Sequence, residues 1–455
     1  MTSRWVMHKF GGTSVANAAG YQAVGRILQS LRQEGERTAV VVSAMSGVTD
    51  GLIELVELAA NRSDSYLAKL QTLKQKHLDA MAELGLSPQP RQALAETVTN
   101  DFKNIEEVLR GIWITGVPSE RTREFVAGHG ELWSAQLLHA HFTEGGHSAA
   151  WLDARKVLVV EPDSRTVTVD WEASQEKLRH LQLAETAADF LVITGFIAST
   201  HDGVATTLKR NGSDFSASIF AALIEADSVT IWTDVDGVLS ADPRRVPDAL
   251  VIPELSYQEA AELAYFGAKV VHPNTMFPAI ARNVPIWIRN TFNSRGAGTK
   301  ISAAPSSAMP VKGFATIDDM ALLNVEGTGM IGIPGVADKL FGALRAVDVS
   351  VVMISQASSE HSICFAVPLA QAELARKTVE DAFFAEMQRG QVQTIEVMKD
   401  CCILAIVGDG MIERLGVAGK FFTALGKAEV NIRAIAQGSS PRGSAAAPEP
   451  QDTGR

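Results

Sequence analysis

Cysteine is scarce in this chain, with three residues among 455. Cys364 stands alone and Cys401 adjoins Cys402, so these residues can form neither the disulfide framework of a small secreted protein nor a metal site with the usual ligand spacing. Basic residues are also outnumbered, 41 against 52 acidic ones, and they are not gathered into a stripe. The net charge of −11 therefore argues against nucleic acid or an anionic membrane as a partner.

Long apolar runs are absent as well. No window holds the roughly 18 uncharged apolar residues that a membrane-spanning helix needs. The N-terminal residues lead into glycines without the apolar stretch of a signal peptide. We therefore expect a soluble protein of the reducing cytoplasm. With 46% hydrophobic residues, the chain has enough apolar material for two or three domains.

Short apolar runs alternate with helical patterns over the first two thirds of the chain. Parallel strands need crossover connections, and helices provide them. The alternation therefore predicts an α/β fold, a three-layer αβα sandwich with a mainly parallel sheet. The runs interpreted as strands are 6–10, 38–42, 191–194, 228–232 and 284–288, and a helix is predicted at 24–31.

The last third of the chain repeats itself at an offset of 81 positions. Residues 340–344 correspond to 421–425, and residues 354–359 correspond to 435–440. Each copy shows a strand, a glycine turn, a helix and a second strand. The pattern predicts a small α+β unit that is used twice.

The two copies differ at their ends, and a linker precedes them. A stretch rich in Gly, Ala, Pro and Ser near 299–312 predicts a boundary between a first domain at 1–302 and the repeated region at 313–440. The first copy has a further strand at 362–367, whereas 441–455 shows no strand pattern and is predicted to be a disordered tail. The second copy is therefore expected to be cut short.

One glycine motif is better explained by the repeat than by a ligand. Gly327, Gly329 and Gly332 satisfy the G-x-G-x-x-G pattern of a dinucleotide-binding turn. That pattern needs an acidic residue about 20 positions on, at the end of the next strand, but Asp348 precedes that strand. Because the turn recurs at 408–410 in the second copy, we interpret it as part of the repeat.

A glycine turn follows the first predicted strand. Lys9, Gly11, Gly12 and Thr13 stand at the carboxyl end of that strand and before a helix, where open parallel sheets bind ligands. Glycines let backbone N–H groups approach phosphate oxygens. Walker A and protein-kinase catalytic-loop motifs are absent. We therefore favour a phosphate-binding turn over a plain turn with a solvated lysine.

A second polar cluster, 209–214, leads into a helix predicted at 215–226. Ser213 or Asp214 is expected to be the N-cap of this helix. Arg210 is a natural clamp for a carboxylate, because a guanidinium there stands beside the free N–H groups of a helix start.

The remaining polar clusters suit phosphoryl transfer. Thr233 and Asp234 follow the strand at 228–232, with Asp242 and Arg244 shortly after. A capping box of Ser256 and Glu259 opens a helix that leads to 266–270. No Ser-His-Asp or Cys-His pattern is present, and the histidines show no metal spacing. Cations, hydroxyls and glycines are the groups used where positioning and charge neutralisation dominate catalysis.

Together these segments resemble the aspartokinases, within the amino-acid kinase superfamily. The likeness is greatest to the aspartokinase half of the bifunctional aspartokinase–homoserine dehydrogenases, and we expect the dehydrogenase half to be missing. The segments that carry the resemblance are 9–14, 42–49, 129–132, 210–214, 232–237, 242–244 and 266–270.

The resemblance implies an amino-acid kinase fold followed by paired ACT-type regulatory units. It implies ATP-dependent phosphorylation of the side-chain carboxylate of L-aspartate to 4-phospho-L-aspartate, the first step toward lysine, threonine and methionine. ATP would be the co-substrate, with Mg²⁺, and no metal ligands are assigned to the protein. Because the nucleophile is already an anion, no general base is needed, and repulsion between two anions is the main obstacle.

The resemblance also assigns roles to residues of this sequence. Lys9 and Lys269 would neutralise the transferring phosphoryl group, and Asp214 would orient Lys9 or a water bound to Mg²⁺. Arg210 would bind the α-carboxylate of aspartate, and Glu131 its ammonium. Ser43, Thr49 and Ser213 complete the substrate set. The residues assigned to ATP are Lys9, Gly11, Gly12, Thr13, Thr233, Asp234, Leu239, Arg244 and Lys269.

Paired ACT units imply an amino-acid effector, threonine or lysine, and a homodimer or homotetramer formed through this region. Gln356 and Gln437 match the glutamines that contact the effector in threonine-sensitive members. The alternative is that each glutamine only satisfies backbone groups at a strand end.

Three departures from the family pattern lead to further expectations. Lys209 stands where relatives have glycine; at positive φ a lysine costs about 1 kcal/mol, and its charge can disturb the site. Leu239 replaces a tyrosine that lies against the nucleotide, which predicts weaker ATP binding. The missing last strand would leave an open sheet edge, which predicts weakened feedback and aggregation.

Two other functions stay open at this stage. One is a catalytically weak regulator that senses an amino acid on the same fold, to which the departures give weight. The other is a kinase for a different small amino acid such as glutamate, which Arg210 and Glu131 do not exclude.

Overall fold

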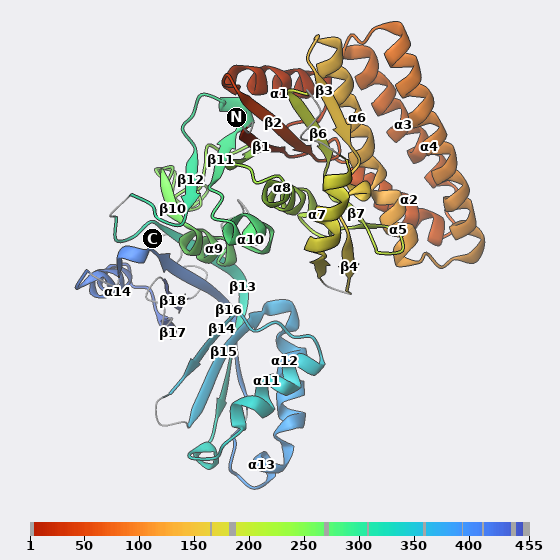
Figure 1. Ribbon diagram of the computed structural model, residues 1–455. Coiled ribbons are helices and arrows are strands. Elements are labelled where there is room, and N and C mark those ends of the chain that lie inside the picture. Colours follow the sequence, from red (N-terminus) through yellow and green to blue (C-terminus); the bar gives the residue numbers. More distant parts are fainter. Residues whose placement is uncertain are drawn as a thin grey trace. The chain divides into compact units, whose positions relative to one another are not determined.

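Figure 1 shows the computed structural model of the chain. It describes residues 4–163, 166–181, 188–267, 273–306, 309–357, 361–393, 395–411, 414–437 and 443–448. Packing divides the chain into two compact units, the first made of Met1–Val238 with Val270–Pro305 and the second of Leu239–Lys269 with Ser306–Arg455. The second unit thus includes Leu239–Lys269, a segment that the predicted domain boundary assigned to the first.

A mainly parallel sheet forms the centre of the first unit. Its strands are β1 (Arg4–Phe10), β2 (Glu36–Val42), β3 (Ala149–Leu152), β6 (Phe190–Thr194), β9 (Ser228–Thr233), β11 (Ile286–Asn290) and β12 (Thr299–Ser302). They lie in the order β12–β11–β9–β1–β2–β6–β3, and only β12 runs antiparallel to its neighbour β11. All five predicted strands are confirmed, although β11 begins two residues later than expected.

Helices cover both faces of this sheet (Figure 1). α1 (Ala18–Leu31) and α6 (His129–Glu144) pack on one face, and α8 (Gly212–Leu223) packs on the other with α10 (Pro273–Ala281) beside it. Because both faces are covered, β2 carries an unbroken apolar run in which Ala39, Val40, Val41 and Val42 have no exposed surface. The predicted three-layer αβα sandwich is confirmed.

The other elements of the first unit extend from this sandwich. The helices are α2 (Val48–Ala60), α3 (Ser65–Glu83), α4 (Pro88–Thr115), α5 (Glu120–Ala127) and α7 (Trp171–His180). Two short antiparallel pairs join β4 (Val160–Pro162) to β5 (Val167–Val169) and β7 (Ile197–Ser199) to β8 (Ala205–Thr207).

The second unit opens with a short strand and a capped helix. β10 (Glu254–Ser256) leads into α9 (Tyr257–Tyr265). The Glu259 backbone N–H donates to Ser256 Oγ at 3.0 Å, and the Ser256 N–H donates to Glu259 Oε2 at 2.8 Å. The predicted capping box is therefore confirmed.

An antiparallel sheet with helices packed against it forms the rest of this unit. Its strands are β13 (Gly313–Glu326), β14 (Met353–Gln356), β15 (Ser362–Pro368), β16 (Glu396–Val407), β17 (Ile432–Gln437) and β18 (Gly443–Pro448). They lie in the order β14–β15–β13–β16–β18–β17. The helices are α11 (Val336–Ala346), α12 (Ala372–Ala382), α13 (Phe384–Gln388) and α14 (Val417–Lys427). The paired α+β units are confirmed, since α11 and α14 begin 81 positions apart.

The strand β18 overturns the prediction of a disordered tail for its part of 441–455. It pairs with β16 and β17, with Ala405 opposite Ala445 and Ala436 opposite the same residue. β18 begins 81 positions after β15, so it is the missing strand of the second copy. The sequence shows no strand pattern here because the residues of β18 are small and have low strand propensity. The strand forms because the edges of β16 and β17 supply backbone partners. Residues 441–442 and 449–455 lie outside the described ranges.

The glycine turns of the two copies pack against each other's entry segments. A Cβ on Gly327 would lie 2.1 Å from the Gln391 carbonyl oxygen, and one on Gly408 would lie 2.3 Å from the Pro310 oxygen. Gln391 stands 81 positions after Pro310, so the contacts are reciprocal. In the first copy, close approach of backbone to backbone explains the glycine that resembled a dinucleotide motif.

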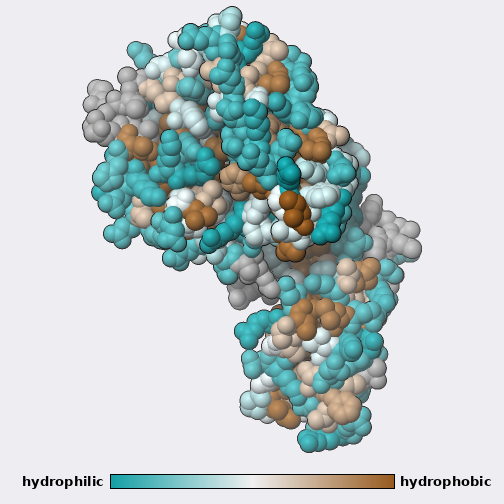
Figure 2. Space-filling model, turned by 90° about the vertical axis from the view of Figure 1, so that its right-hand side faces the viewer, coloured by the Kyte–Doolittle hydropathy of each residue, from teal (hydrophilic) through white to brown (hydrophobic). Residues whose placement is uncertain are grey.

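The surface is predominantly hydrophilic on the face drawn in Figure 2, where hydrophobic residues form small groups. Among the described residues, no helix combines the length and the apolar character that crossing a bilayer would require.

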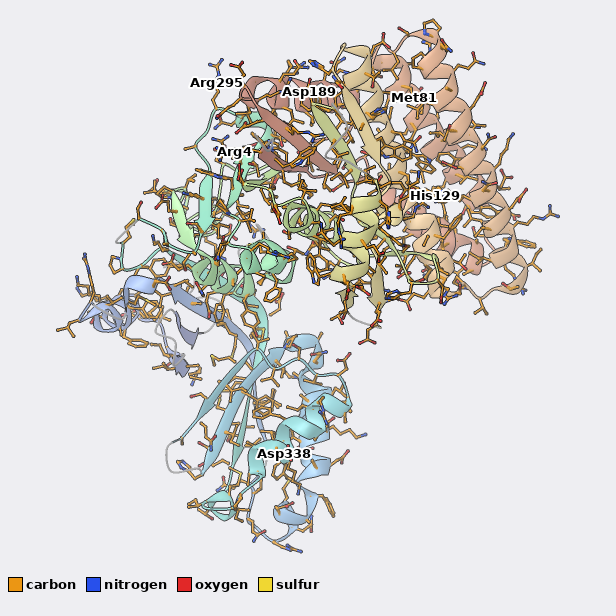
Figure 3. The ribbon with its side chains drawn as sticks, viewed as in Figure 1. Arg4, Met81, His129, Asp189, Arg295 and Asp338 are labelled. Atoms are coloured by element: carbon orange, nitrogen blue, oxygen red, sulfur yellow. The ribbon has the colours of Figure 1, made fainter. Side chains whose placement is uncertain are left out.

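A buried histidine lies in the helical part of the first core. α3 and α4 pack there with Met81, labelled in Figure 3. His77 of α3 is fully buried, its Nδ1 bonds the Leu73 carbonyl oxygen at 2.8 Å, and its ring centroid lies 4.7 Å from that of Trp133. Burial lowers the pKa of His77 from 6.5 to about 4.

We predict that His77 makes stability fall in mild acid. Its pKa is about 4 when folded and 6.5 when unfolded, so protonation favours the unfolded state as the pH drops below 6.5. Between pH 7 and pH 5.5 this histidine should remove about 1 kcal/mol of unfolding free energy. Urea unfolding of His77→Leu should show a correspondingly smaller loss. The exposed His180→Leu serves as control, and equal losses in the two variants would contradict the prediction.

Candidate active site

The site is built at the carboxyl edge of the parallel sheet of the first unit. β1 ends in the glycine turn, β2 runs into Ser43, and α8 begins beside them. The Ser43 backbone N–H donates to the Phe10 carbonyl oxygen at 3.1 Å, which holds the two loops together. Segments far apart in the chain therefore share one rim.

A lysine and an aspartate meet at this rim with little access to water. Lys9 Nζ lies 2.6 Å from Asp214 Oδ1, and their side chains are 10% and 17% exposed. The contact lacks hydrogen-bond geometry, so Asp214 Oδ1 has no hydrogen-bond partner among the described residues. The two predicted catalytic groups, from β1 and α8, are thus brought together.

The glycine turn lies close against the loop that follows β2. A Cβ on Gly12 would come 3.0 Å from the Ala44 carbonyl oxygen, and one on Gly11 would come 3.6 Å from Lys9 Nζ. Thr13 is exposed, and the Ser14 N–H closes the turn on the Gly11 oxygen at 2.9 Å. α1 begins only at Ala18, so any phosphate here would meet the N–H groups of the turn rather than those of the helix.

Glu131 is a carboxyl group buried beside this turn. It stands in the first turn of α6 and is 4% exposed. Burial raises the pKa of Glu131 from 4.5 to about 8, although hydrogen bonds from the Ala44 N–H and the Thr49 hydroxyl and the charge of Lys9 act in the opposite direction. Its Oε2 has no hydrogen-bond partner within the described ranges. An acid of this kind is poised to receive a cationic group.

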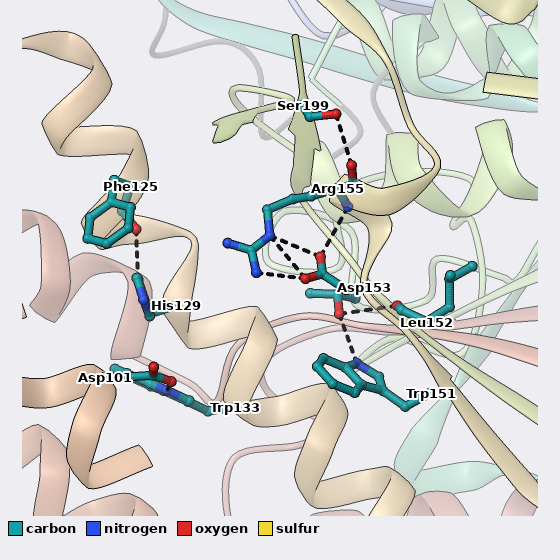
Figure 4. A network of polar contacts seen from close by, with 10 residues as sticks. Asp101, Phe125, His129, Trp133, Trp151, Leu152, Asp153, Arg155 and Ser199 are labelled. Carbon is teal, nitrogen blue, oxygen red and sulfur yellow. Dashed lines mark hydrogen bonds and ion pairs between the residues drawn. The ribbon is translucent and has the colours of Figure 1, made fainter. Parts of the chain in front are cut away.

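The helix that carries Glu131 is fixed by a polar network (Figure 4). His129 Nδ1 bonds the Phe125 carbonyl oxygen at 2.8 Å, and Trp133 Nε1 donates to Asp101 at 2.9 Å. Arg155 and Asp153 form an ion pair beside it, with N–O distances down to 2.6 Å. Sequence reasoning missed Asp101 and Phe125, because contacts of α6 with α4 and α5 leave no local signal.

The start of α8 joins the loop after β2. Ser43 Oγ and Ser213 Oγ lie 2.8 Å apart. Gly195 permits this approach, since a Cβ there would lie 2.8 Å from the Val42 oxygen and 2.9 Å from Ser213 Cβ. Arg210 is exposed and forms no ion pair with any described residue. Its guanidinium is therefore available to a ligand.

The N-cap of α8 differs from the prediction. The cap is Asn211, at φ 57° and without a side-chain capping bond, rather than Ser213 or Asp214. The helix also begins at Gly212, three residues earlier than expected. An asparagine tolerates the left-handed region better than most residues, so the backbone closes the helix start and frees both side chains for the rim.

Lys209 has the positive φ expected from the sequence, but its charge is accounted for. Its φ is 59°, and its Nζ lies 2.5 Å from both Glu120 and Glu124 of α5. Burial acts to lower the pKa of Lys209, yet the hydrogen bonds that it donates to these two carboxylates outweigh burial and the pKa is raised. The expectation that this charge disturbs the site loses its basis, because the ammonium is paired.

The residues predicted for the nucleotide are divided between the two units. Thr233 Oγ1 donates to Asp234 at 3.1 Å in the first unit. In the second unit, Leu239 bridges to Val251, and Arg244 is paired with Asp242, its NH2 2.6 Å from Oδ2. Lys269 lies outside the described residues.

The predicted effector glutamines lie at two strand ends of the second unit. Gln356 is the last residue of β14 and is exposed, and Gln437 is the last residue of β17, with its side chain outside the described part. Ser355 Oγ donates to the Ile435 carbonyl oxygen at 2.9 Å, so the two strands are in contact.

Family models match both parts of the chain. That of the amino acid kinase family matches residues 4–290, and that of the ACT domain matches 323–383 and 404–443. Bifunctional aspartokinase/homoserine dehydrogenase 2 of Arabidopsis thaliana is 46% identical over 443 residues, which are 96% of this chain and 48% of that protein. The bifunctional enzyme of Haemophilus influenzae is 37% identical, over 95% of this chain and 53% of its own. The chain spans about half the length of the curated relatives it matches.

Solved aspartokinases share the fold. E. coli aspartokinase III in complex with aspartate and ADP superposes with a TM-score of 0.81 at 27% identity, covering 99% of this chain and 97% of that one. The same enzyme in complex with lysine and aspartate gives 0.79 at 27% identity, with the same coverage. The resemblance to aspartokinases is thus confirmed. Because the matched range 4–290 contains the parallel strands of the sheet, the glycine turn and the Lys9–Asp214 pair, the chain belongs to the amino acid kinase family.

Proposed function

We propose that this chain transfers the γ-phosphoryl group of ATP to the side-chain carboxylate of L-aspartate, forming 4-phospho-L-aspartate and ADP. One observation carries the proposal: a buried cation, Lys9, which is paired with Asp214, and a buried acid, Glu131, both lie beside the same glycine turn. The likeness to aspartokinases solved with aspartate and ADP supports this choice of substrates.

For this phosphoryl transfer, the protein needs mainly to position the two substrates and to neutralise their charge. A carboxylate oxygen of aspartate attacks the γ-phosphorus, the bond from that phosphorus to the β–γ bridging oxygen breaks, and ADP leaves. Because both reactants are anions, cations near the γ-phosphate lower the barrier. Lys9 supplies one, and its link to Asp214 keeps the ammonium aimed at the rim. We assign the same role to Lys269.

Both charged groups on the α-carbon of aspartate find partners. Arg210 is unpaired among the described residues and would bind the α-carboxylate, and Glu131 would accept the ammonium. Ser43, Ser213 and Thr49 would border the substrate. Gly11, Gly12 and Thr13 would hold phosphate oxygens, and Thr233, Asp234, Leu239 and Arg244 would bind the nucleotide.

Mg²⁺ fits this site as a companion of ATP. No cluster of three or more His, Cys, Asp and Glu in the described ranges forms a protein cage for a metal. Mg²⁺ normally takes one or two carboxylates and fills its shell with phosphate oxygens and water. Asp214, which also pairs with Lys9, is the carboxylate that this rim offers. The ion would supply further neutralisation of phosphate charge.

The paired ACT units support feedback by an amino acid. We propose threonine or lysine as effector, bound near Gln356 and Gln437, and a homodimer or homotetramer formed through these units. The second copy has its full set of strands in β18, so the reason for expecting weakened feedback is removed. A cytoplasmic location stays a prediction, since the Arabidopsis relatives are named chloroplastic.

The alternative of a weak amino-acid sensor is not favoured. Lys209, Leu239 and the shortened second copy gave it weight, and the paired ammonium and β18 remove the first and the last of these reasons. A glutamate kinase remains to be separated by experiment, as glutamate carries the same two α-carbon charges.

The proposed activity predicts acyl phosphate that can be trapped with hydroxylamine as the hydroxamate. Aspartate and ATP should both be required, and glutamate should neither replace aspartate nor compete well with it. Arg210→Ala should raise the aspartate KM about 10- to 100-fold, because a hydrogen-bonded charge is lost, and leave the ATP KM within about twofold. Arg91→Ala, at an exposed arginine of α4, is the matched control. No hydroxamate from the wild-type chain would overturn the proposal.

Glu131 predicts that aspartate binds better as the pH rises through 8. With a pKa of about 8, roughly a tenth of this group is ionised at pH 7 and half at pH 8. Only the carboxylate attracts the ammonium, so the aspartate KM should fall about fivefold over that interval. Glu131→Gln should raise the KM and abolish the pH dependence. A flat profile in the wild-type chain would contradict this role.

The effector assignment predicts that Gln356→Ala raises the half-inhibitory concentration of the effective amino acid about tenfold, since one binding contact is lost. Uninhibited activity should stay within twofold. Gln371→Ala, at a glutamine that bonds the Ser350 N–H instead, is the control. An unaltered inhibition curve for Gln356→Ala would favour the role at a strand end alone.

A further inference from the structure

Three charged side chains form a compact group on α5 and the loop before α8. Lys209 Nζ lies 2.5 Å from Glu120 Oε1 and 2.5 Å from Glu124 Oε1. The side chains of Lys209 and Glu124 are 23% and 11% exposed, whereas Glu120 is 66% exposed. Glu124 also accepts a hydrogen bond from Thr206 Oγ1 at 2.7 Å. The inner pair is therefore less exposed to screening by solvent than an ordinary surface ion pair.

The backbone at Lys209 is held in a conformation that its side chain does not favour. Its φ is 59°, and Asn211 follows at 57°, so left-handed residues stand on both sides of Arg210. Glycine would adopt such a conformation without strain. A lysine persists there only when its surroundings fix it, and the contacts with Glu124 and Glu120 hold the end of its side chain.

This contact links the two segments that would bind the charges of the substrate. On one side, Lys209 is joined by the peptide bond to Arg210, whose guanidinium has no ion-pair partner in the described ranges. On the other side, α5 leads directly into α6, and His129 Nδ1 bonds the Phe125 carbonyl oxygen at 2.8 Å. Glu131 stands two positions after His129 on the same helix, α6.

We propose that Lys209 is a positioning residue, whose contact with Glu124 holds Arg210 at the separation from Glu131 that matches the carboxylate and ammonium of an α-amino acid. The inference rests on the proposed function and adds to it the group that sets amino-acid recognition. Lys209 itself does not touch the substrate, because its ammonium is occupied by two carboxylates. Two charges on separate elements bind one small molecule well only if their spacing is fixed beforehand.

Substitutions at both ends of the contact test this role. Lys209→Met keeps the apolar stem and removes the charge, Lys209→Gly also relieves the left-handed strain, and Glu124→Gln removes the inner carboxylate. Each should raise the aspartate KM at least fivefold, with kcat and the ATP KM within twofold. Lys209→Arg should restore most of the affinity. Lys69→Met, which removes the ion pair with Glu54 between α3 and α2, is the matched control and should change neither KM.

Two further measurements separate positioning from a general loss of structure. Lys209→Gly should be at least as resistant to heat as the Met variant, since strain is relieved, and should still show the raised aspartate KM. The double variant Lys209→Met with Glu124→Gln should be no worse than either single variant, because both remove the same contact. Amide exchange of a peptide that covers 205–215 should be faster in Lys209→Met.

The outcomes distinguish the inference from the proposed function. An active wild-type chain in which the Lys209 variants keep the aspartate KM within twofold overturns the inference alone. An unaltered KM in Glu124→Gln with a raised one in Lys209→Met also overturns it, because the lysine would then act on the site without its inner partner. A wild-type chain that forms no acyl phosphate overturns the proposed function and this inference with it.

Discussion

The contact between Lys9 and Asp214 is the interaction on which the candidate active site depends. A lysine removed from water at the end of a strand needs a counter-charge, and Asp214 brings it from the first turn of α8. That requirement ties α8 to β1 and so fixes the loop that carries Arg210 on the same rim as the glycine turn. Phosphate would then meet an ammonium that is already held in position, and pre-positioned charge stabilises developing charge most effectively.

Glu131 adds a group to the rim that can bind a cation. Lys9 and the turn favour anions, whereas Glu131 is buried deeply enough for its pKa to reach about 8. An isolated buried carboxylate is costly, so burial favours its neutral form. A substrate that carries both a carboxylate and an ammonium satisfies both ends of the rim at once. A simple dicarboxylate would leave Glu131 without a cation, and this disfavours it.

Much of this arrangement is legible in the sequence, and the exceptions have physical reasons. Apolar runs flanked by helices predicted the strands of the first sheet, and Ser256 with Glu259 predicted a capping box, because these signals are local. The partners of Lys209 are Glu120 and Glu124, which stand 89 and 85 positions earlier in the chain. No pattern of residue spacing reveals contacts over that separation. Asn211 caps α8 through its backbone conformation, which side-chain rules do not capture. β18 was missed because its small residues pair only where β16 and β17 leave an edge open.

The reciprocal packing of the glycine turns has a consequence for the second unit. Gln393 N–H donates to the Glu326 oxygen at 2.7 Å, and Lys312 N–H donates to the Val407 oxygen at 2.8 Å, so each copy closes the backbone ladder of its twin. The backbone hydrogen bonds of each copy are thus completed by the other copy. We therefore expect the two copies to fold and unfold together, as one cooperative unit. A ligand that rigidifies one copy would therefore also reduce the conformational freedom of the other, without motion about a hinge. Duplication here created a single mechanical element rather than two independent sensors.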